Sequence, residues 1–205
     1  VDWILRCVEA GKTLGIRTIR LDPAMHQRGL PIREAAEKAI EVLESVLTEI
    51  PPTEEISFGL ENHGEYSNNP EFLQTVFSAL KDSRVGVTLD SGNFYWYGFP
   101  LDKVYQLFTD LAPYTKHTHV KNISYPAEVR QERRETGYGY EKYVAPIYEG
   151  DIDHRRLVNC LKEAGYAGDI CIEDESLGRF PLEKWAEVLV KDVEHLEGML
   201  NSNSL

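Results

Sequence analysis

Apolar residues recur along the chain with two periods, one typical of helices and one typical of strands. The helical period predicts helices at 2–14, from Pro31, from Asn69-Pro70, near 104–111, near 157–164 and from Pro181. Short β-rich runs between them predict five strands, near 16–21, 56–61, 85–90, 116–120 and 169–173. This regular alternation predicts a parallel sheet with right-handed crossovers.

Four of the predicted strands end in a side chain that can bind a metal ion. Glu61, Asp90 and Glu173 each follow an apolar run, and His119 lies near the end of the run at 116–120. The first three of the four, in chain order, are spaced by 29 residues twice, and one strand-helix unit needs about 30. Because the carboxyl ends of parallel strands meet at one rim, these groups are candidates to bind a divalent cation.

A closed barrel and an open doubly wound sheet both fit the alternation of elements. No glycine-rich phosphate loop follows a predicted strand, and four polar strand ends converge only if the sheet curves closed. We therefore expect an α/β fold of the TIM-barrel type with five parallel strands. A complete barrel needs about 250 residues, so about three N-terminal strands are expected to be absent and the N-terminus to be truncated or processed. We expect one domain over 1–200 and a polar tail at 201–205.

Composition narrows the partners and the compartment. A net charge of −12 and a pI near 5.0 disfavour nucleic acids and anionic membranes, and no run approaches the ~18 apolar residues of a membrane span. Arg130, Arg133 and Arg134 alternate with glutamates, which predicts a solvated surface. Three cysteines without metal-type spacing predict reduced thiols in a cytoplasmic protein.

Six short blocks resemble the signature blocks of the sugar phosphate isomerase/epimerase family, the xylose isomerase-like TIM barrels. They occur in family order over roughly residues 10 to 200: Leu60-Glu61-Asn62-His63, Leu89-Asp90-Ser91-Gly92-Asn93, His117-Thr118-His119-Val120-Lys121, Glu149-Gly150-Asp151-Ile152-Asp153, Gly165-Tyr166-Ala167-Gly168 and Ile172-Glu173. The resemblance implies a divalent ion (Mn²⁺, Mg²⁺, Co²⁺ or Zn²⁺) bound by Glu61, Asp90, His119 and Glu173. It also implies that Glu61 and Glu173 move the proton, as in the ketose epimerases.

The same chemistry follows from the residues. Removing a proton next to a carbonyl needs a Lewis acid, and epimerisation needs a carboxylate on each face of the carbon. Candidate substrate-binding residues are His63, Asn93, Lys121 and Trp96. Asn93 stands where the ketose epimerases carry a histidine, which leaves the substrate open.

Each of these assignments has a structural alternative. Lys121 could be a surface lysine and His63 an ordinary loop residue, while Trp96 belongs to an aromatic run that is either core or a wall against a sugar ring. His117 shares the face of His119, so the choice between them rests on the family pattern. Asp151 and Asp153 are expected to cap the helix that begins near residue 154.

Three functional hypotheses remain. The first is a metal-dependent isomerase or epimerase of a sugar or sugar-like polyol, with lyases and dehydratases that begin with the same proton abstraction. The second is a metal-independent glycoside hydrolase, against which His119 argues. The third is a non-catalytic, partner-dependent subunit, and an endonuclease is more remote. We expect a homo-oligomer or a partner that completes the barrel, and a lid or subunit contact at 121–150.

Overall fold

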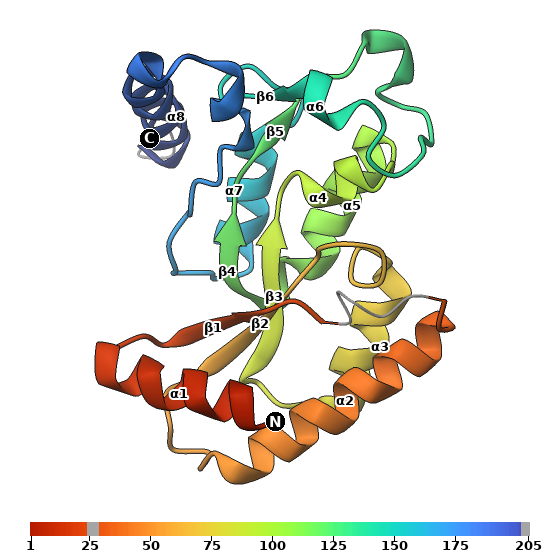
Figure 1. Ribbon diagram of the computed structural model, residues 1–205, viewed down its shortest axis with the longest axis vertical. Coiled ribbons are helices and arrows are strands. Elements are labelled where there is room, and N and C mark those ends of the chain that lie inside the picture. The colour runs from red at the N-terminus through yellow and green to blue at the C-terminus, as the bar shows by residue number, and fades with distance from the viewer. Residues whose placement is uncertain (24–28, 202–205) are drawn as a thin grey trace. The chain divides into compact units, whose positions relative to one another are not determined.

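A computed structural model of the protein describes residues 1–23 and 29–201. Of the polar tail predicted at 201–205, Asn201 is the last residue of a helix, and 202–205 lie outside the described residues. The chain divides into two compact units (Figure 1). The first contains Val1–Leu89 and Tyr114–His117, and the second contains Asp90–Pro113 and the chain from Thr118 onward. Each unit is described separately below. The prediction of a single domain over 1–200 stays a prediction.

The main sheet has four strands in the order of the chain: β1 (Thr18–Leu21), β2 (Ser57–Glu61), β3 (Val85–Asp90) and β4 (Thr115–His119). β1 pairs with β2 and β2 with β3 in parallel, with Leu21 opposite Leu60 and Glu61 opposite Thr88. The α/β class and the sequential parallel strands are therefore confirmed.

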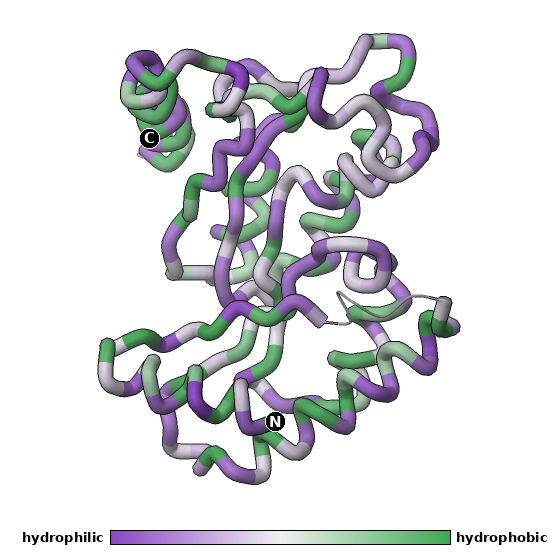
Figure 2. The backbone as a smooth tube through the Cα atoms, viewed as in Figure 1, coloured by the Kyte–Doolittle hydropathy of each residue, from purple (hydrophilic) through white to green (hydrophobic). Residues whose placement is uncertain are grey.

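The helices of the first unit are α1 (Asp2–Leu14), α2 (Ile32–Glu49) and α3 (Pro70–Leu80). α1 ends at Gly15, whose φ of 72° lies in the left-handed region that favours glycine. α3 begins at the predicted cap, because the Asn69 side chain accepts a hydrogen bond from the backbone of Glu71. Figure 2 shows hydrophobic and hydrophilic residues alternating along α2, and its apolar side contributes Val46 to a buried cluster that includes Phe58 of β2.

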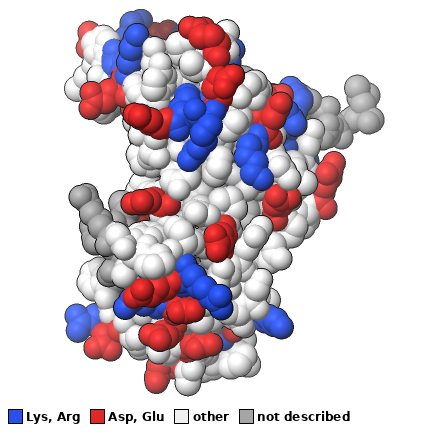
Figure 3. All heavy atoms as spheres, turned by 90° about the vertical axis from the view of Figure 1, so that its right-hand side faces the viewer, with Lys and Arg blue, Asp and Glu red and all other residues white. Residues whose placement is uncertain are grey.

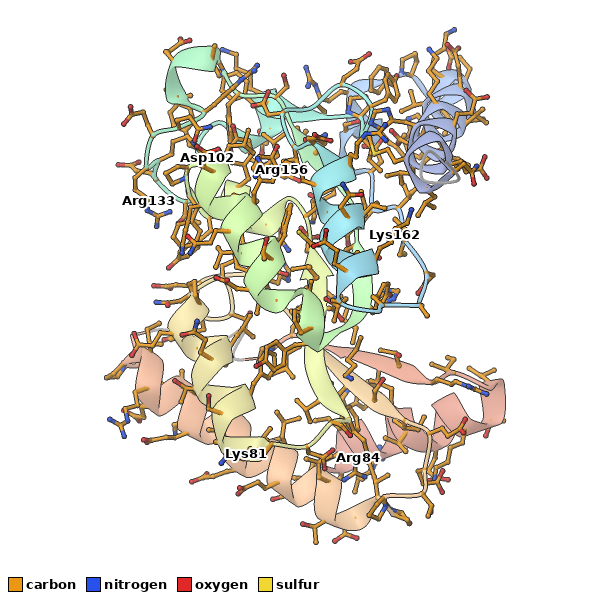
Figure 4. All side chains as sticks on the ribbon, turned by 180° about the vertical axis from the view of Figure 1, so that it is seen from behind. Lys81, Arg84, Asp102, Arg133, Arg156 and Lys162 are labelled. Atoms are coloured by element: carbon orange, nitrogen blue, oxygen red, sulfur yellow. The ribbon has the colours of Figure 1, made fainter. Side chains whose placement is uncertain are left out.

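The turn before β3 is fixed by one arginine, labelled in Figure 4. The guanidinium of Arg84 donates to the carbonyl oxygen of Ile50 at 2.9 Å and pairs with Asp82 at 2.7 Å. Asp82 also accepts a hydrogen bond from the backbone of Arg84. These contacts connect the start of β3 to the end of α2.

The second unit contains five α-helices within the described residues, with a small antiparallel ribbon. They are α4 (Asn93–Trp96), α5 (Leu101–Leu111), α6 (Tyr140–Tyr143), α7 (His154–Glu163) and α8 (Trp185–Asn201), with β5 (Asn122–Ile123) paired to β6 (Val144–Ala145). Short 3-10 turns, including η3 (Glu175–Arg179), connect them. On α7, Arg156 lies over the ring of Tyr105 from α5, 3.7 Å from its centroid (Figure 4). The ribbon was not predicted.

The predicted fifth strand at 169–173 is wrong, because only one parallel bridge, between Val120 and Ile172, forms there. The side chain of Thr118 takes the place of the backbone ladder before that bridge. Its hydroxyl donates to the carbonyl oxygen of Asp169 at 2.9 Å and accepts from the backbone N–H of Cys171 at 3.2 Å. A hydroxyl that satisfies both backbone groups removes the need for strand pairing, so the segment stays irregular.

The prediction that the arginine cluster is a solvated surface is wrong for Arg134, whose exposed fraction is 7%. Its guanidinium donates to the carbonyl oxygens of Tyr95 and Phe99 and lies over the rings of Tyr95 and Tyr125. Arg133 stays exposed and stacks on Phe99. Alternation with glutamate could not distinguish these two neighbours, because only the fold decides which one turns inward.

The two predicted caps of α7 have different outcomes. Asp153 caps the helix as expected, since its side chain accepts from the backbone of Arg155 at 2.9 Å. Asp151 does not cap the helix. Its carboxylate accepts hydrogen bonds from the Tyr95 hydroxyl and the Tyr125 backbone N–H and pairs with Arg130 at 2.9 Å, so it stabilises the long segment before α7.

The surface charges and the apolar lengths of the helices bear on the predictions about nucleic-acid and membrane partners. Figure 3 shows acidic and basic side chains interspersed on one face of the molecule rather than separated into fields. None of the described helices combines the length and the apolar character that crossing a membrane requires. The cytoplasmic location stays a prediction.

Candidate metal centre

Three of the predicted ligands come together in the second unit. Asp90 is the last residue of β3, His119 is the last of β4, and Glu173 follows the Val120–Ile172 bridge. One ligand atom from each of Asp90, His119 and Glu173 lies within 4.8 Å of the others. Asp90 is fully buried, whereas the Glu173 side chain is 36% exposed. The arrangement combines two carboxylates and an imidazole, donors that hard to borderline divalent cations accept.

The backbone around Asp90 fixes the direction of its side chain. One carboxylate oxygen, Oδ1, accepts hydrogen bonds from the N–H groups of Gly92 at 2.8 Å and Asn93 at 2.7 Å. The N–H of Ser91 donates to the carbonyl oxygen of His119 at 2.9 Å, which joins the loop after β3 to the end of β4. Asp90 and His119 are therefore held in place by hydrogen bonds of the chain itself.

Lys121 lies among the carboxylates of this centre and is 4% exposed. Its Nζ is 2.6 Å from Glu175 Oε1, 2.8 Å from Glu173 Oε2 and 3.2 Å from Asp90 Oδ2. Burial favours the neutral amine, but the carboxylates outweigh it and raise the pKa of Lys121. Burial likewise opposes ionisation of Glu173, and the Lys121 ammonium outweighs it and lowers the pKa of Glu173.

The charges of this cluster do not balance. Three carboxylates face one ammonium, so two negative charges remain in excess when His119 is neutral. Gathered anions repel one another strongly where water is scarce. A divalent cation would neutralise the excess and would find its donors in place.

In the first unit, Glu61 ends β2 and is 1% exposed. Arg20 of β1 donates to it from Nε at 2.6 Å, and His63 Nδ1 lies 3.8 Å from the same oxygen. His63 also contacts Asp22 at 3.1 Å, and one ligand atom from each of Asp22, Glu61 and His63 lies within 4.8 Å of the others. Burial opposes ionisation of Asp22, but His63 and Arg20 outweigh it and lower its pKa.

Arg20 and Asp22 were not singled out in the sequence. The available signal was a charged residue inside the apolar run 16–21, at a position that the register places opposite Gly59. An arginine at such a position needs an anionic partner, and Glu61 is that partner. This pairing orients the Glu61 carboxylate within its own unit.

Two of the predicted substrate-binding residues of the second unit, Asn93 and Lys121, contact Asp90. The Nδ2 of Asn93 is buried and has no hydrogen-bond partner among the described residues, so it is a donor available to a ligand. The neighbouring Phe94 and Tyr95 are fully buried core residues, which limits the predicted aromatic wall to Trp96 and Tyr97. Of the two histidines, His119 belongs to the second unit with Asp90, and His117 belongs to the first.

Residues 1–198 match the family described as xylose isomerase-like TIM barrel. The chain belongs to that family. The match confirms the resemblance of the signature blocks, and it identifies the four strands as part of a TIM-barrel-like fold in which a complete barrel has eight. The expected five strands are corrected to four.

Solved structures share the fold at low sequence identity. The IolI protein with a bound zinc atom is 19% identical, with a TM-score of 0.68 over 93% of this chain and 66% of its own. The Escherichia coli 3-keto-D-glucoside 4-epimerase YcjR is 16% identical, with a TM-score of 0.59 over 92% and 68%. The probable 3-DHS dehydratase AsbF of Bacillus anthracis is 14% identical, with a TM-score of 0.57 over 98% and 70%.

This chain spans about two thirds of the length of those proteins. No curated protein matches it. The family includes sugar isomerases, epimerases and dehydratases, and the candidate ligands described above are compatible with a metal-dependent member.

Proposed function

We propose that the protein is a metal-dependent isomerase or epimerase that acts on a sugar or sugar-like polyol by removing a proton next to a carbonyl. The observation that carries the proposal is the cluster of Asp90, His119 and Glu173 around Lys121, with its excess of two negative charges. The family and its solved epimerase support the same class of chemistry.

Glu61 is the proposed fourth ligand. The register pairs Glu61 with Thr88, and the alternation of side chains puts Asp90, two residues later, on the same face of β3 as Thr88. Three carboxylates and one imidazole suit Mn²⁺, Mg²⁺, Co²⁺ or Zn²⁺. A divalent ion bound there would supply a Lewis acid that stabilises negative charge on the substrate oxygens.

The protein groups divide the remaining work. Glu173, kept ionised by Lys121, takes the proton from the substrate carbon and later releases it to solvent. Glu61 takes up a proton from solvent and delivers it to the other face of that carbon. Lys121 donates a hydrogen bond to a substrate oxygen. Asn93 Nδ2 and His63 bind substrate hydroxyls, and Trp96 contacts the sugar ring.

The test is incorporation of deuterium from deuterated water into a panel of ketoses. The wild-type enzyme with Mn²⁺ is expected to place deuterium on one carbon. Glu173→Gln is expected to slow this exchange by about 100-fold or more, the usual contribution of a general base, with a smaller effect on bound metal. Glu163→Gln, at an exposed position on α7, is the matched control and should exchange at the wild-type rate. Full exchange by a Glu61→Gln and Glu173→Gln double variant would contradict the mechanism.

A dehydratase is the second candidate, because it begins with the same proton abstraction. Asn93 favours it, since the ketose epimerases carry a histidine at that position, and a probable dehydratase shares the fold. The two outcomes differ in the product. An isomerase or epimerase returns a substrate isomer that contains deuterium, whereas a dehydratase releases water and leaves a conjugated carbonyl that absorbs in the near ultraviolet.

A further inference from the structure

The long segment between β5 and β6 contains a turn with the sequence Gly137-Tyr138-Gly139-Tyr140. Both glycines adopt the left-handed backbone conformation, with φ of 75° and 55°, which other residues rarely adopt. The N–H of Gly137 donates to the carbonyl oxygen of Trp96 at 2.9 Å. The turn is therefore fixed against α4, close to the predicted substrate-binding residues.

The two tyrosines of this turn face different surroundings. Tyr138 is stacked on Tyr143, with ring centroids 6.1 Å apart and an angle of 13°, and its ring lies 5.9 Å from that of Tyr125. Those aromatic contacts hold the turn against its own unit. Tyr140 instead directs its hydroxyl to Glu175, where it donates a hydrogen bond to Oε2.

Glu175 joins this tyrosine to the candidate metal centre. Its other oxygen, Oε1, lies 2.6 Å from Lys121 Nζ, and Lys121 reaches Asp90 and Glu173. One carboxylate thus orients both the phenol and the ammonium. With its proton donated to Glu175, the Tyr140 oxygen keeps lone pairs that can accept a hydrogen bond, while Lys121 has only hydrogens to donate.

We propose that Tyr140 binds the substrate directly by accepting a hydrogen bond from a substrate hydroxyl, and that Glu175 is the positioning residue that orients Tyr140 together with Lys121. An acceptor beside a donor matches neighbouring hydroxyls of a neutral polyol. It disfavours a phosphate or carboxylate at that end of the substrate, because the Glu175 charge and the phenolic oxygen repel anions. This inference rests on the proposed sugar or polyol function.

The experiment measures binding of xylitol to the Mn²⁺-loaded protein by titration calorimetry. Tyr140→Phe removes only the hydroxyl and is expected to weaken xylitol binding about tenfold, the value of one hydrogen bond, with bound Mn²⁺ and the melting temperature unchanged. Tyr138→Phe is the matched control on the same turn and should bind as the wild type does. Glu175→Gln should also weaken xylitol binding. The double variant Tyr140→Phe and Glu175→Gln should bind xylitol no more weakly than whichever single variant binds it less tightly, because both substitutions act through the contact between Tyr140 and the substrate.

Two negative results have different meanings. Equal binding by Tyr140→Phe and the wild type would overturn the role of Tyr140, and additive losses in the double variant would overturn the positioning role of Glu175. A wild-type protein that retains Mn²⁺ but does not bind xylitol would contradict the polyol function itself, and the inference with it.

Discussion

One buried histidine, His154, has hydrogen-bond partners next to the candidate metal centre. His154 is fully buried, and its Nε2 lies 3.2 Å from Ser91 Oγ and 3.2 Å from the carbonyl oxygen of Lys121. Ser91 and Lys121 are also joined directly, since the Lys121 backbone N–H donates to Ser91 Oγ. A neutral imidazole that donates from Nε2 fits this network, and burial lowers the pKa of His154 to about 4.

The sign of the pH dependence follows from that shift. Above about pH 6.5 the histidine is neutral in both the folded and the unfolded chain, so the folded state keeps its full stability. As pH falls toward 4, His154 is protonated in the unfolded chain but stays neutral in the folded chain. The free energy of unfolding therefore falls by roughly 3 kcal/mol. Denaturant unfolding of the wild type and His154→Gln between pH 7 and 5 should therefore give a flatter profile for the variant. Parallel profiles would show that His154 does not titrate in this way.

The sequence pattern predicted the candidate ligands at strand ends and missed the site residues that lie in loops and short turns. Asp90, His119 and Glu173 each follow a strand or a bridge, so their position in the pattern predicted that they meet. Glu175 lies in a 3-10 turn and Tyr140 begins the one-turn helix α6, and elements this short have no periodicity that relates a residue to the sheet. Their contacts depend on the path of long loops, which one sequence does not encode as a local pattern.

At the scale of elements, the segment between β5 and β6 depends on Arg134. The buried guanidinium donates to the carbonyl oxygens of Tyr95, Phe99, Val129 and Glu132. Arg134→Met should lower the free energy of unfolding by about 2–4 kcal/mol, because four hydrogen bonds between the guanidinium and backbone carbonyls would be lost together. It should also increase cleavage at 124–143 in limited proteolysis.

Arg133→Met is the matched control for that prediction. Arg133 is exposed, donates to the carbonyl oxygen of Tyr97 and stacks on Phe99, so its loss should cost about 1 kcal/mol or less. Equal stability of the two variants in urea unfolding would show that Arg134 does not organise the segment. The role of 121–150 as a lid or subunit contact stays a prediction. The proposed contact between Tyr140 and the substrate would be one contribution of this segment to the site.

The helices and strands that carry strong periodicity were predictable, and the exceptions have physical causes. Helix α3 begins directly after Asn69 and α1 covers 2–14, as predicted, because the signals at helix ends act on adjacent residues. The segment 169–173 has the composition of a strand but pairs only at Ile172, because the Thr118 hydroxyl occupies the backbone groups before it. A side chain from a distant residue can override local propensity in this way.

At the scale of the whole molecule, the main sheet has four described strands, whereas a complete TIM barrel has eight. Among the described strands of the main sheet, β1 and β4 lie at the ends of the strand order. Edge strands have backbone groups available for pairing, and a second copy or a partner that completes the barrel stays a prediction. The proposed metal ligands come from three of the four strands and the segment after them. Metal binding is therefore the property that the proposed function depends on.

Metal content is the measurement that tests the central claim most directly. Elemental analysis of the purified protein is expected to find about one divalent ion per chain, with a chelator lowering the melting temperature and added Mn²⁺ restoring it, because the gathered carboxylates repel one another without a cation. Asp90→Asn should reduce bound metal about tenfold or more, whereas Asp102→Asn, at an exposed position on α5 labelled in Figure 4, should bind as the wild type does. Protein without metal, whose melting curve changes neither with a chelator nor with Mn²⁺, would contradict the account.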